Sequence, residues 1–151
     1  LWGVIHGVRV FTPLLLAHGE EAHILNTASV AGLISPPGMG IYNVSKHAVV
    51  ALTETLHHDL AARGARVRCS VLCPAFFPSG IADSQRTRPA GLAGAAPRTA
   101  EDDAREAGFR KAVESGRLSA EDVADAAFEA IRDERFYVLT HPRILPAVER
   151  R

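Results

Sequence analysis

Three side chains in the first third of the chain have the chemistry to move a proton to or from an alcohol. Tyr42 and Lys46 are four residues apart at the start of a predicted helix, so one helical turn places the phenol and the ammonium on the same face. A nearby ammonium and the positive end of a helix both favour the ionised form of a phenol, whose ordinary pKa is about 10. Ser29, thirteen residues before Tyr42, could hold the oxygen of the same substrate. These residues predict an acid–base site that interconverts an alcohol and a carbonyl group.

Each of these residues also has an ordinary structural interpretation. A tyrosine at the start of a helix often only hydrogen-bonds its hydroxyl, and a lysine one turn later often points into water. Ser29 by itself is an unremarkable serine after a strand. The acid–base hypothesis gains support because Pro74 follows the next predicted strand in the way that Ser29 follows the first.

Hydrophobic periodicity and turn residues predict an alternation of helices and strands. Apolar residues at helical spacing indicate helices, short apolar runs bounded by turn residues indicate strands, and Ser119 with Asp122 is a cap signature for the last helix. Pro13 should bend or end the first helix locally, and the tail from His141 should lie at the surface. The predicted helices cover residues 1–18, 41–62, 100–114 and a segment that includes 123–131, and the predicted strands cover 22–27, 67–72 and 136–140.

This alternation predicts an α/β fold. Crossover connections return each strand in the same direction, so about three parallel strands with flanking helices are expected. Ligands of such sheets bind beyond the carboxyl ends of the strands, and Ser29 and Pro74 should both lie at that edge. Residues 75–98 are rich in Gly, Ala, Pro and Arg and have no period, which predicts a mobile loop or lid within a lid-like substrate region over 75–118.

The composition excludes several classes of function. The 151 residues suit one domain, and 47% of them are hydrophobic, which is enough for a packed core. Seventeen basic and seventeen acidic side chains cancel, so nucleic acid is not an expected partner. The longest apolar stretch, residues 1–17, contains His6, Arg9 and Pro13, which argues against a membrane span.

The cysteines and histidines predict a cytoplasmic protein without a metal site. Cys69 and Cys73 would be about 13 Å apart on one extended segment, which is too far for a disulfide. Two buried thiols are the expected state in a reducing cytoplasm. His57, His58 and Asp59 are consecutive, so their side chains point apart on a helix and lack the spacing of metal ligands.

Three short segments together resemble a known enzyme family. They are Asn26–Ser29 (NTAS), Tyr42–Lys46 (YNVSK) and Leu72–Pro74 (LCP), and their order and spacing are similar to the C-terminal half of a short-chain dehydrogenase/reductase. The clearest part of the match covers residues 1–84. The resemblance implies a doubly wound, parallel Rossmann-type sheet, and interconversion of a small-molecule secondary alcohol and a ketone with NAD or NADP.

The resemblance also implies a role for each residue of the predicted site. Tyr42 would be the general acid/base, Lys46 would stabilise the phenolate and hydrogen-bond the nicotinamide ribose, and Ser29 would orient the substrate oxygen. Substrate choice would depend on the loops 33–40 and 76–98. The residues expected to contact the cofactor are Tyr42, Lys46, Pro74, Ala75, Phe77 and Ser79.

Part of the family pattern is absent from the chain. It has no glycine-rich fingerprint to bind a pyrophosphate, so residues 1–151 are expected to be a single partial domain, a fragment without the cofactor-docking half. The helices over 1–18 and 41–62 correspond to helices that contact a partner subunit in the family, which implies a homodimer or homotetramer. The alternative is a non-catalytic α/β remnant that acts as an oligomerisation or binding module.

Overall fold

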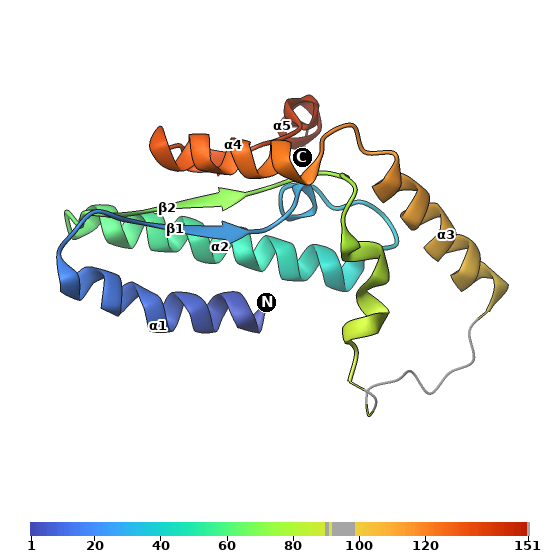
Figure 1. Cartoon of the computed structure of the whole chain (residues 1–151), viewed down its shortest axis with the longest axis horizontal. Helices are drawn as coiled ribbons and strands as arrows, with labels where there is room; N and C mark the ends of the chain where they lie inside the picture. The colour runs from blue at the N-terminus through green and yellow to red at the C-terminus, as the bar shows by residue number, and fades with distance from the viewer. Residues whose placement is uncertain (90, 92–98, 151) are drawn as a thin grey trace. The chain divides into compact units, whose positions relative to one another are not determined.

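A computed structural model of the chain describes residues 1–89, 91 and 99–150. The described residues form two compact units, one of Leu1–Ala75 with the chain from Ala124 onward, and one of Phe76–Val123. The first unit contains a three-stranded sheet in the order β1-β2-β3 (Figure 1). In chain order the α-helices and strands are α1 (Trp2–His18), β1 (Ala22–Thr27), α2 (Gly40–Ala62), β2 (Val67–Leu72), α3 (Ala100–Glu114), α4 (Ala120–Arg132), β3 (Tyr137–Val138) and α5 (Leu145–Glu149).

All three strands are parallel, which confirms the predicted α/β sheet. β1 and β2 pair in register from Ala22 with Val67 to Thr27 with Leu72, and β2 continues the ladder by pairing Leu72 with Val138 of β3. The carboxyl ends of the strands therefore meet at one edge of the sheet, where the segments that follow β1 and β2 begin.

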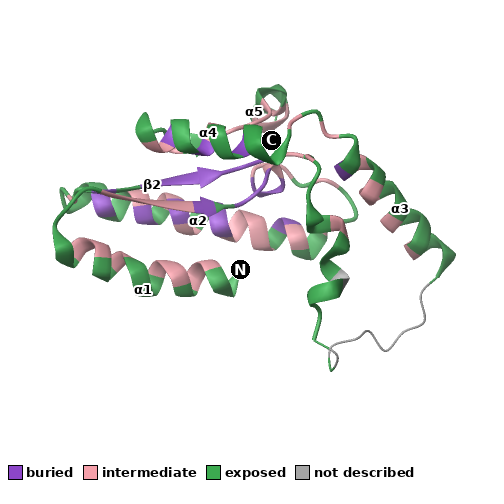
Figure 2. Ribbon diagram, in the orientation of Figure 1, coloured by how far each residue is buried: buried purple, intermediate pink, exposed green. Residues whose placement is uncertain are grey.

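β2 is the central strand of this sheet and the most deeply buried. Every residue of β2 except Arg68 is buried, whereas Asn26 is the only buried residue of β1 (Figure 2). Within the described part of the chain, no strand pairs with the outer edge of β1. An edge of this kind can pair with a further strand.

The core of the first unit lies between the sheet and its helices. α1 and α2 cover one face, and α4 covers the other (Figure 1). The side chains of α1 pack against the C-terminal half of α2 and the start of β2, and each fully buried valine or leucine adds roughly 1.5–3 kcal/mol to the stability of the fold. This cluster is built on Leu56, Leu60, Val67 and Cys69, with Val8, Leu15 and Leu16 packed against it.

α1 does not end at Pro13, although the sequence predicts a bend or an end there. The helix continues to His18 and ends at Gly19, whose φ of 71° is the left-handed conformation that favours glycine. Pro13 lacks an N–H and leaves the carbonyl of Arg9 without its helical partner. Both residues are exposed, so water can solvate that carbonyl and the helix persists.

The C-terminal tail differs most from the sequence prediction. β3 is limited to Tyr137–Val138, shorter than the predicted strand over 136–140. The chain then turns through a short 3-10 helix, Pro142–Ile144, into α5. His141, which was expected at the surface, is half-buried and contacts the segment after β2.

The second unit contains α3 and a 3-10 segment, Gly80–Thr87, inside the predicted loop. Residues 90 and 92–98 of that predicted loop lie outside the described residues. Arg110 of α3 binds Asp83 of the 3-10 segment at 2.8 Å, a contact between distant residues that no local pattern could indicate. Thr99 and Asp102 form the cap of α3, so its predicted start is confirmed.

No helix in the described ranges is long and apolar enough to cross a membrane.

Candidate active site

Ser29 lies directly against the segment that follows β2. Its hydroxyl donates to the carbonyl oxygen of Pro74 at 3.3 Å and accepts from the N–H of Ala31 at 3.2 Å. The parallel pairing continues one residue past the end of β1: the N–H of Ala28 donates to the carbonyl oxygen of Leu72 at 2.8 Å. The register of β1 and β2 thus brings Ser29 and Pro74 together at the carboxyl edge of the sheet. Ser29 is 8% exposed, so the residue is almost fully buried at this edge.

Lys46 connects α2 to the end of β1. Its ammonium donates to the carbonyl oxygen of Thr27 at 3.3 Å, two residues before Ser29. The same nitrogen lies 5.6 Å from the centre of the Tyr42 ring, one helical turn away. The ammonium thus contacts the end of the strand that leads to Ser29 and lies over the ring of Tyr42.

Burial shifts the pKa values of Lys46 and of its neighbour Cys73. Burial lowers the pKa of Lys46, and Cys73 opposes that effect in part. Burial raises the pKa of the Cys73 thiol to about 11, against weaker opposing effects of the Ser29 backbone and Lys46. Near neutral pH the thiol stays uncharged, so Lys46 is the only one of these two groups that carries charge.

Gly32 lets the segment after Ser29 pack directly on α2, and no local pattern in the sequence indicates this contact. A Cβ atom at Gly32 would lie 2.7 Å from the backbone oxygen of Lys46 and 2.8 Å from Cγ2 of Val50. Only glycine allows so close an approach of the two backbones. Gly32 therefore sets the distance between the Ser29 segment and the helix that carries Tyr42 and Lys46.

A buried hydrogen bond joins β1 to α2 behind the site. Asn26 Nδ2 donates to Thr53 Oγ1 at 3.0 Å, and the Thr53 hydroxyl donates to the backbone oxygen of Val49 at 2.7 Å. Thr53 is fully buried and Asn26 is 8% exposed. Because both partners are out of water, the bond favours one alignment of the helix along the strand. Periodicity predicted α2 but gave no sign of this pair.

Asn43 hydrogen-bonds the loop that precedes α2. Its Nδ2 donates to the carbonyl oxygen of Pro36 at 2.9 Å. The bond holds the loop 33–40, where the sequence predicts substrate contacts, against the helical turn that contains Tyr42. The side chain is next to Tyr42 in the sequence, yet its partner could be found only from the structure.

The other residues predicted to contact a cofactor divide between the two units. Pro74 is buried and Ala75 is half-buried, and both belong to the unit that contains the sheet. The N–H of Ala75 donates to Nδ1 of His141 at 3.3 Å. Phe77 and Ser79 belong to the second unit, and their cofactor contacts remain predictions.

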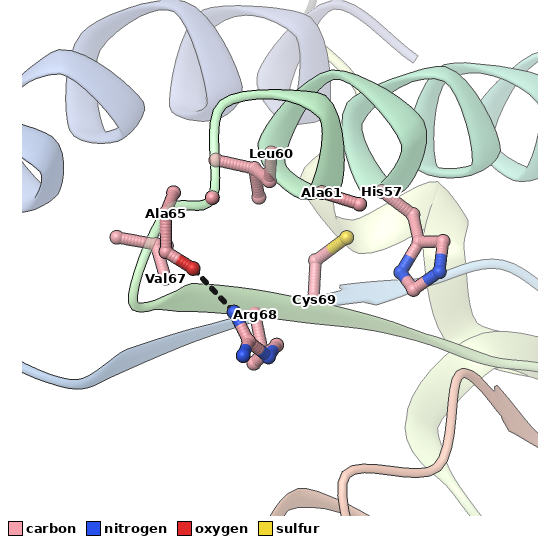
Figure 3. A pocket seen from close by; sticks show the side chains of 8 residues that line it. His57, Leu60, Ala61, Ala65, Val67, Arg68 and Cys69 are labelled. Atoms are coloured by element: carbon pink, nitrogen blue, oxygen red, sulfur yellow. Dashed lines mark hydrogen bonds between the residues drawn. The ribbon is translucent and has the colours of Figure 1, made fainter.

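A cavity of about 330 Å³ lies at the opposite end of the sheet. It is formed by the C-terminal end of α2 and the start of β2, and the side chains of His57 and Cys69 line it (Figure 3). None of the residues of the predicted site lines it. Since ligands of parallel sheets bind beyond the carboxyl ends of the strands, we assign the candidate active site to the Ser29 edge.

The residues at this edge suit proton transfer at a substrate oxygen. A serine hydroxyl, a phenol and an ammonium are present, and the ammonium has three donors, of which one is used by Thr27. The remaining donors could bind a ribose hydroxyl, so the residues fit a nicotinamide nucleotide. Among the described residues, no group of three or more histidine, cysteine or acidic side chains could hold a metal ion.

The chain belongs to the short-chain dehydrogenase family, whose model matches residues 1–90. The CLA biosynthesis dehydrogenase/reductase of Lactiplantibacillus plantarum is 33% identical over 153 residues, which cover 100% of this chain and 54% of that protein. The 1-deoxy-11-beta-hydroxypentalenate dehydrogenase of Streptomyces avermitilis is 36% identical over 140 residues, which cover 93% of this chain and 43% of that protein. The chain thus spans about half the length of these curated relatives.

A solved structure agrees closely with the fold. A short-chain dehydrogenase/reductase from Burkholderia phymatum in complex with NAD is 60% identical and superposes with a TM-score of 0.94. The match covers 97% of this chain and 52% of that protein. The three parallel strands and their helices are therefore part of a Rossmann-type α/β fold.

Proposed function

We propose that this chain is the catalytic, C-terminal half of an NAD(P)-dependent oxidoreductase that interconverts a secondary alcohol and a ketone. One observation carries the proposal: the ammonium of Lys46 lies 5.6 Å from the Tyr42 ring centre and donates at 3.3 Å to Thr27, two residues before Ser29. The dehydrogenase names of the relatives support it, as does the complex of the Burkholderia phymatum protein with NAD. The cofactor would be NAD or NADP, docked mainly by a preceding half.

Tyr42 would act as the general acid/base of the reaction. In oxidation, its phenolate accepts the hydroxyl proton of the alcohol, and Lys46 stabilises that phenolate. When bound, the nicotinamide would supply or accept the hydride. In reduction, Tyr42 returns a proton to the ketone oxygen.

Ser29 would hold the substrate oxygen. Its hydroxyl donates to Pro74 and accepts from Ala31 in the chain without substrate. Because the single O–H of the alcohol is given to Tyr42, the Ser29 hydroxyl would turn its own proton from Pro74 toward the substrate oxygen. Pro74, Ala75, Phe77 and Ser79 would line the cofactor.

The Tyr42→Phe variant tests this function. The protein would be expressed in frame with its upstream coding sequence, and the reduction of NAD or NADP by secondary alcohols would be followed by absorbance. Loss of the phenol should lower kcat by about 100-fold or more while cofactor affinity stays within about threefold. Tyr137 is the second of two tyrosines and hydrogen-bonds Glu54, so Tyr137→Phe is the matched control. Turnover that survives in Tyr42→Phe would refute the assigned role.

We also infer that α1 and α2 contact a second copy of the chain, giving a homodimer or homotetramer. Trp2, Val10 and Leu14 lie on one face of α1 and are 69%, 52% and 58% exposed. Ile41 and Val44 at the start of α2 are 86% and 66% exposed. Apolar surface of this extent is typical of an interface.

Light scattering measures this association directly. Leu14→Glu should reduce the molar mass to that of a smaller assembly, because a charge would be buried in the interface. Leu145→Glu, an exposed leucine on α5, is the control and should leave the mass unchanged. A parent protein that oligomerises in this way but never turns over an alcohol would favour the non-catalytic module instead.

The state of the cysteines agrees with a cytoplasmic location, which we propose on this ground. Cys69 and Cys73 are both free and buried. Free thiols persist in a reducing compartment.

A further inference from the structure

The C-terminal segment reaches the candidate active site through one histidine. Nδ1 of His141 accepts a hydrogen bond from the N–H of Ala75 at 3.3 Å and lies 2.8 Å from the Thr140 hydroxyl. His141 comes three residues after the end of β3, and its partner Ala75 comes three residues after the end of β2. This contact joins the end of the chain to the segment that holds Pro74.

The peptide group between Pro74 and Ala75 is held from both sides. Its carbonyl oxygen accepts from the Ser29 hydroxyl at 3.3 Å and from the N–H of Val30 at 3.0 Å. Its N–H donates to His141. Because a peptide group is planar, its C=O and N–H point in opposite directions and rotate together. His141 on one side therefore orients the carbonyl that binds the Ser29 hydroxyl on the other.

The contact defines the form of the histidine. Nδ1 accepts from Ala75, so it carries no proton, and a neutral ring then has its proton on Nε2. The Thr140 hydroxyl lies 2.8 Å from the same Nδ1 and is the donor in this tautomer. Burial lowers the pKa of His141, which agrees with the neutral form. A side chain without an acceptor would leave the half-buried N–H of Ala75 without its partner.

We propose that His141 is a positioning residue for the reaction: it orients the Pro74–Ala75 peptide and, through it, the Ser29 hydroxyl. This inference rests on the proposed function, since Ser29 is the residue that would hold the substrate oxygen. His141 itself touches neither the substrate nor the reacting atoms in this scheme. Its effect should fall on the chemical step.

The experiment compares the wild type with two variants, in the protein expressed with its upstream half. His141→Leu removes the acceptor at similar size, and His141→Asn retains an oxygen that can accept from Ala75. His58→Leu, an exposed histidine of α2, controls for the substitution itself. Steady-state kcat and KM are measured together with hydrogen exchange at the Ala75 amide, and circular dichroism gives the folded fraction.

In His141→Leu the Ala75 amide should exchange about tenfold faster, and kcat should fall about tenfold with little change in the KM for the cofactor. His141→Asn should restore both values to within about threefold of the wild type. His58→Leu should change neither.

Two outcomes would overturn the proposal. One is a His141→Leu variant with wild-type kcat. The other is a His141→Asn variant that is as slow as His141→Leu although its Ala75 amide is protected, which would make the ring itself the requirement. If His141→Leu does not fold, the kcat of His141→Asn and the exchange rate of its Ala75 amide still test the proposal. A wild type without turnover refutes the proposed function instead, and the exchange rates then report on the hydrogen bond alone.

Discussion

Lys46 donates a hydrogen bond from its ammonium to the carbonyl oxygen of Thr27 at 3.3 Å, and this bond ties α2 to the carboxyl end of β1. The strand delivers Ser29 two residues later, and the helix presents Tyr42 one turn earlier. A single side chain thus relates the two elements on which the proposed chemistry depends.

Replacement of this lysine should stop the reaction without unfolding the protein. In Lys46→Met the proton transfer proposed for Tyr42 loses its neighbouring positive charge, and kcat should fall by about 100-fold or more. Steady-state kinetics at saturating cofactor, with circular dichroism as a check of folding, measure the effect. Lys111→Met on α3 is the control and should keep wild-type kcat. A Lys46→Met enzyme with kcat within threefold of wild type would contradict the assigned role. A threefold change corresponds to about 0.65 kcal/mol in the activation free energy.

A methyl group at Gly32 should destabilise the fold. It would lie 2.7 Å from the backbone oxygen of Lys46, so the Ser29 segment or α2 must shift, at a cost of about 1–3 kcal/mol. Denaturant unfolding of Gly32→Ala measures the loss. Gly40→Ala is the matched control, because nothing lies within 4 Å of a Cβ atom there. Equal stability of the two variants would show that the close approach is not needed.

The hydroxyl of Thr53 should contribute more to the stability of the fold than its methyl group does. Thr53→Val keeps the shape but leaves the amide of Asn26 without an acceptor in the core, at a cost of about 1–3 kcal/mol. Thr53→Ser retains the hydroxyl and should restore the hydrogen bond, although it loses a buried methyl group. Urea unfolding of both variants tests this order. A Thr53→Val protein more stable than Thr53→Ser would mean that the methyl group outweighs the hydrogen bond.

The two cysteines should resist alkylation in the folded protein. Burial raises the pKa of both Cys69 and Cys73 from 9.0 to about 11, so little thiolate exists at pH 8. Iodoacetamide followed by mass spectrometry should show slow labelling at pH 8 and rapid labelling after unfolding in guanidinium. Similar rates in both states would contradict the burial of these thiols.

The same pKa values give a direction for stability against pH. A thiol with a raised pKa in the folded state ionises more readily when unfolded, so its contribution is complete below pH 9.0 and declines as the pH rises toward about 11. The Tm should therefore fall over this window, and less so in Cys69→Ala. A Tm that rises from pH 9 to 11 would contradict this sign.

Much of the fold follows from local patterns in the chain. The bounds of β1, β2 and α3 agree with those expected from apolar runs and caps, and α2 begins only one residue earlier than expected. These elements are predictable because their signals lie within a few residues of one another. The sequence does not predict the 3-10 segment Gly80–Thr87, whose Asp83 is bound by Arg110, twenty-seven residues away.

The candidate site also has features that the sequence predicts and features that only the tertiary structure shows. Spacing and residue type alone bring Tyr42 and Lys46 onto one helical face and place Ser29 and Pro74 after neighbouring strands, because these relations come from helical and strand geometry. Only the tertiary structure shows that Gly32 permits the contact with α2, and that His141 holds the Pro74–Ala75 peptide from the far end of the chain. A hydrogen bond or a close approach between distant residues depends on how elements pack, and packing leaves no periodic signal in the sequence.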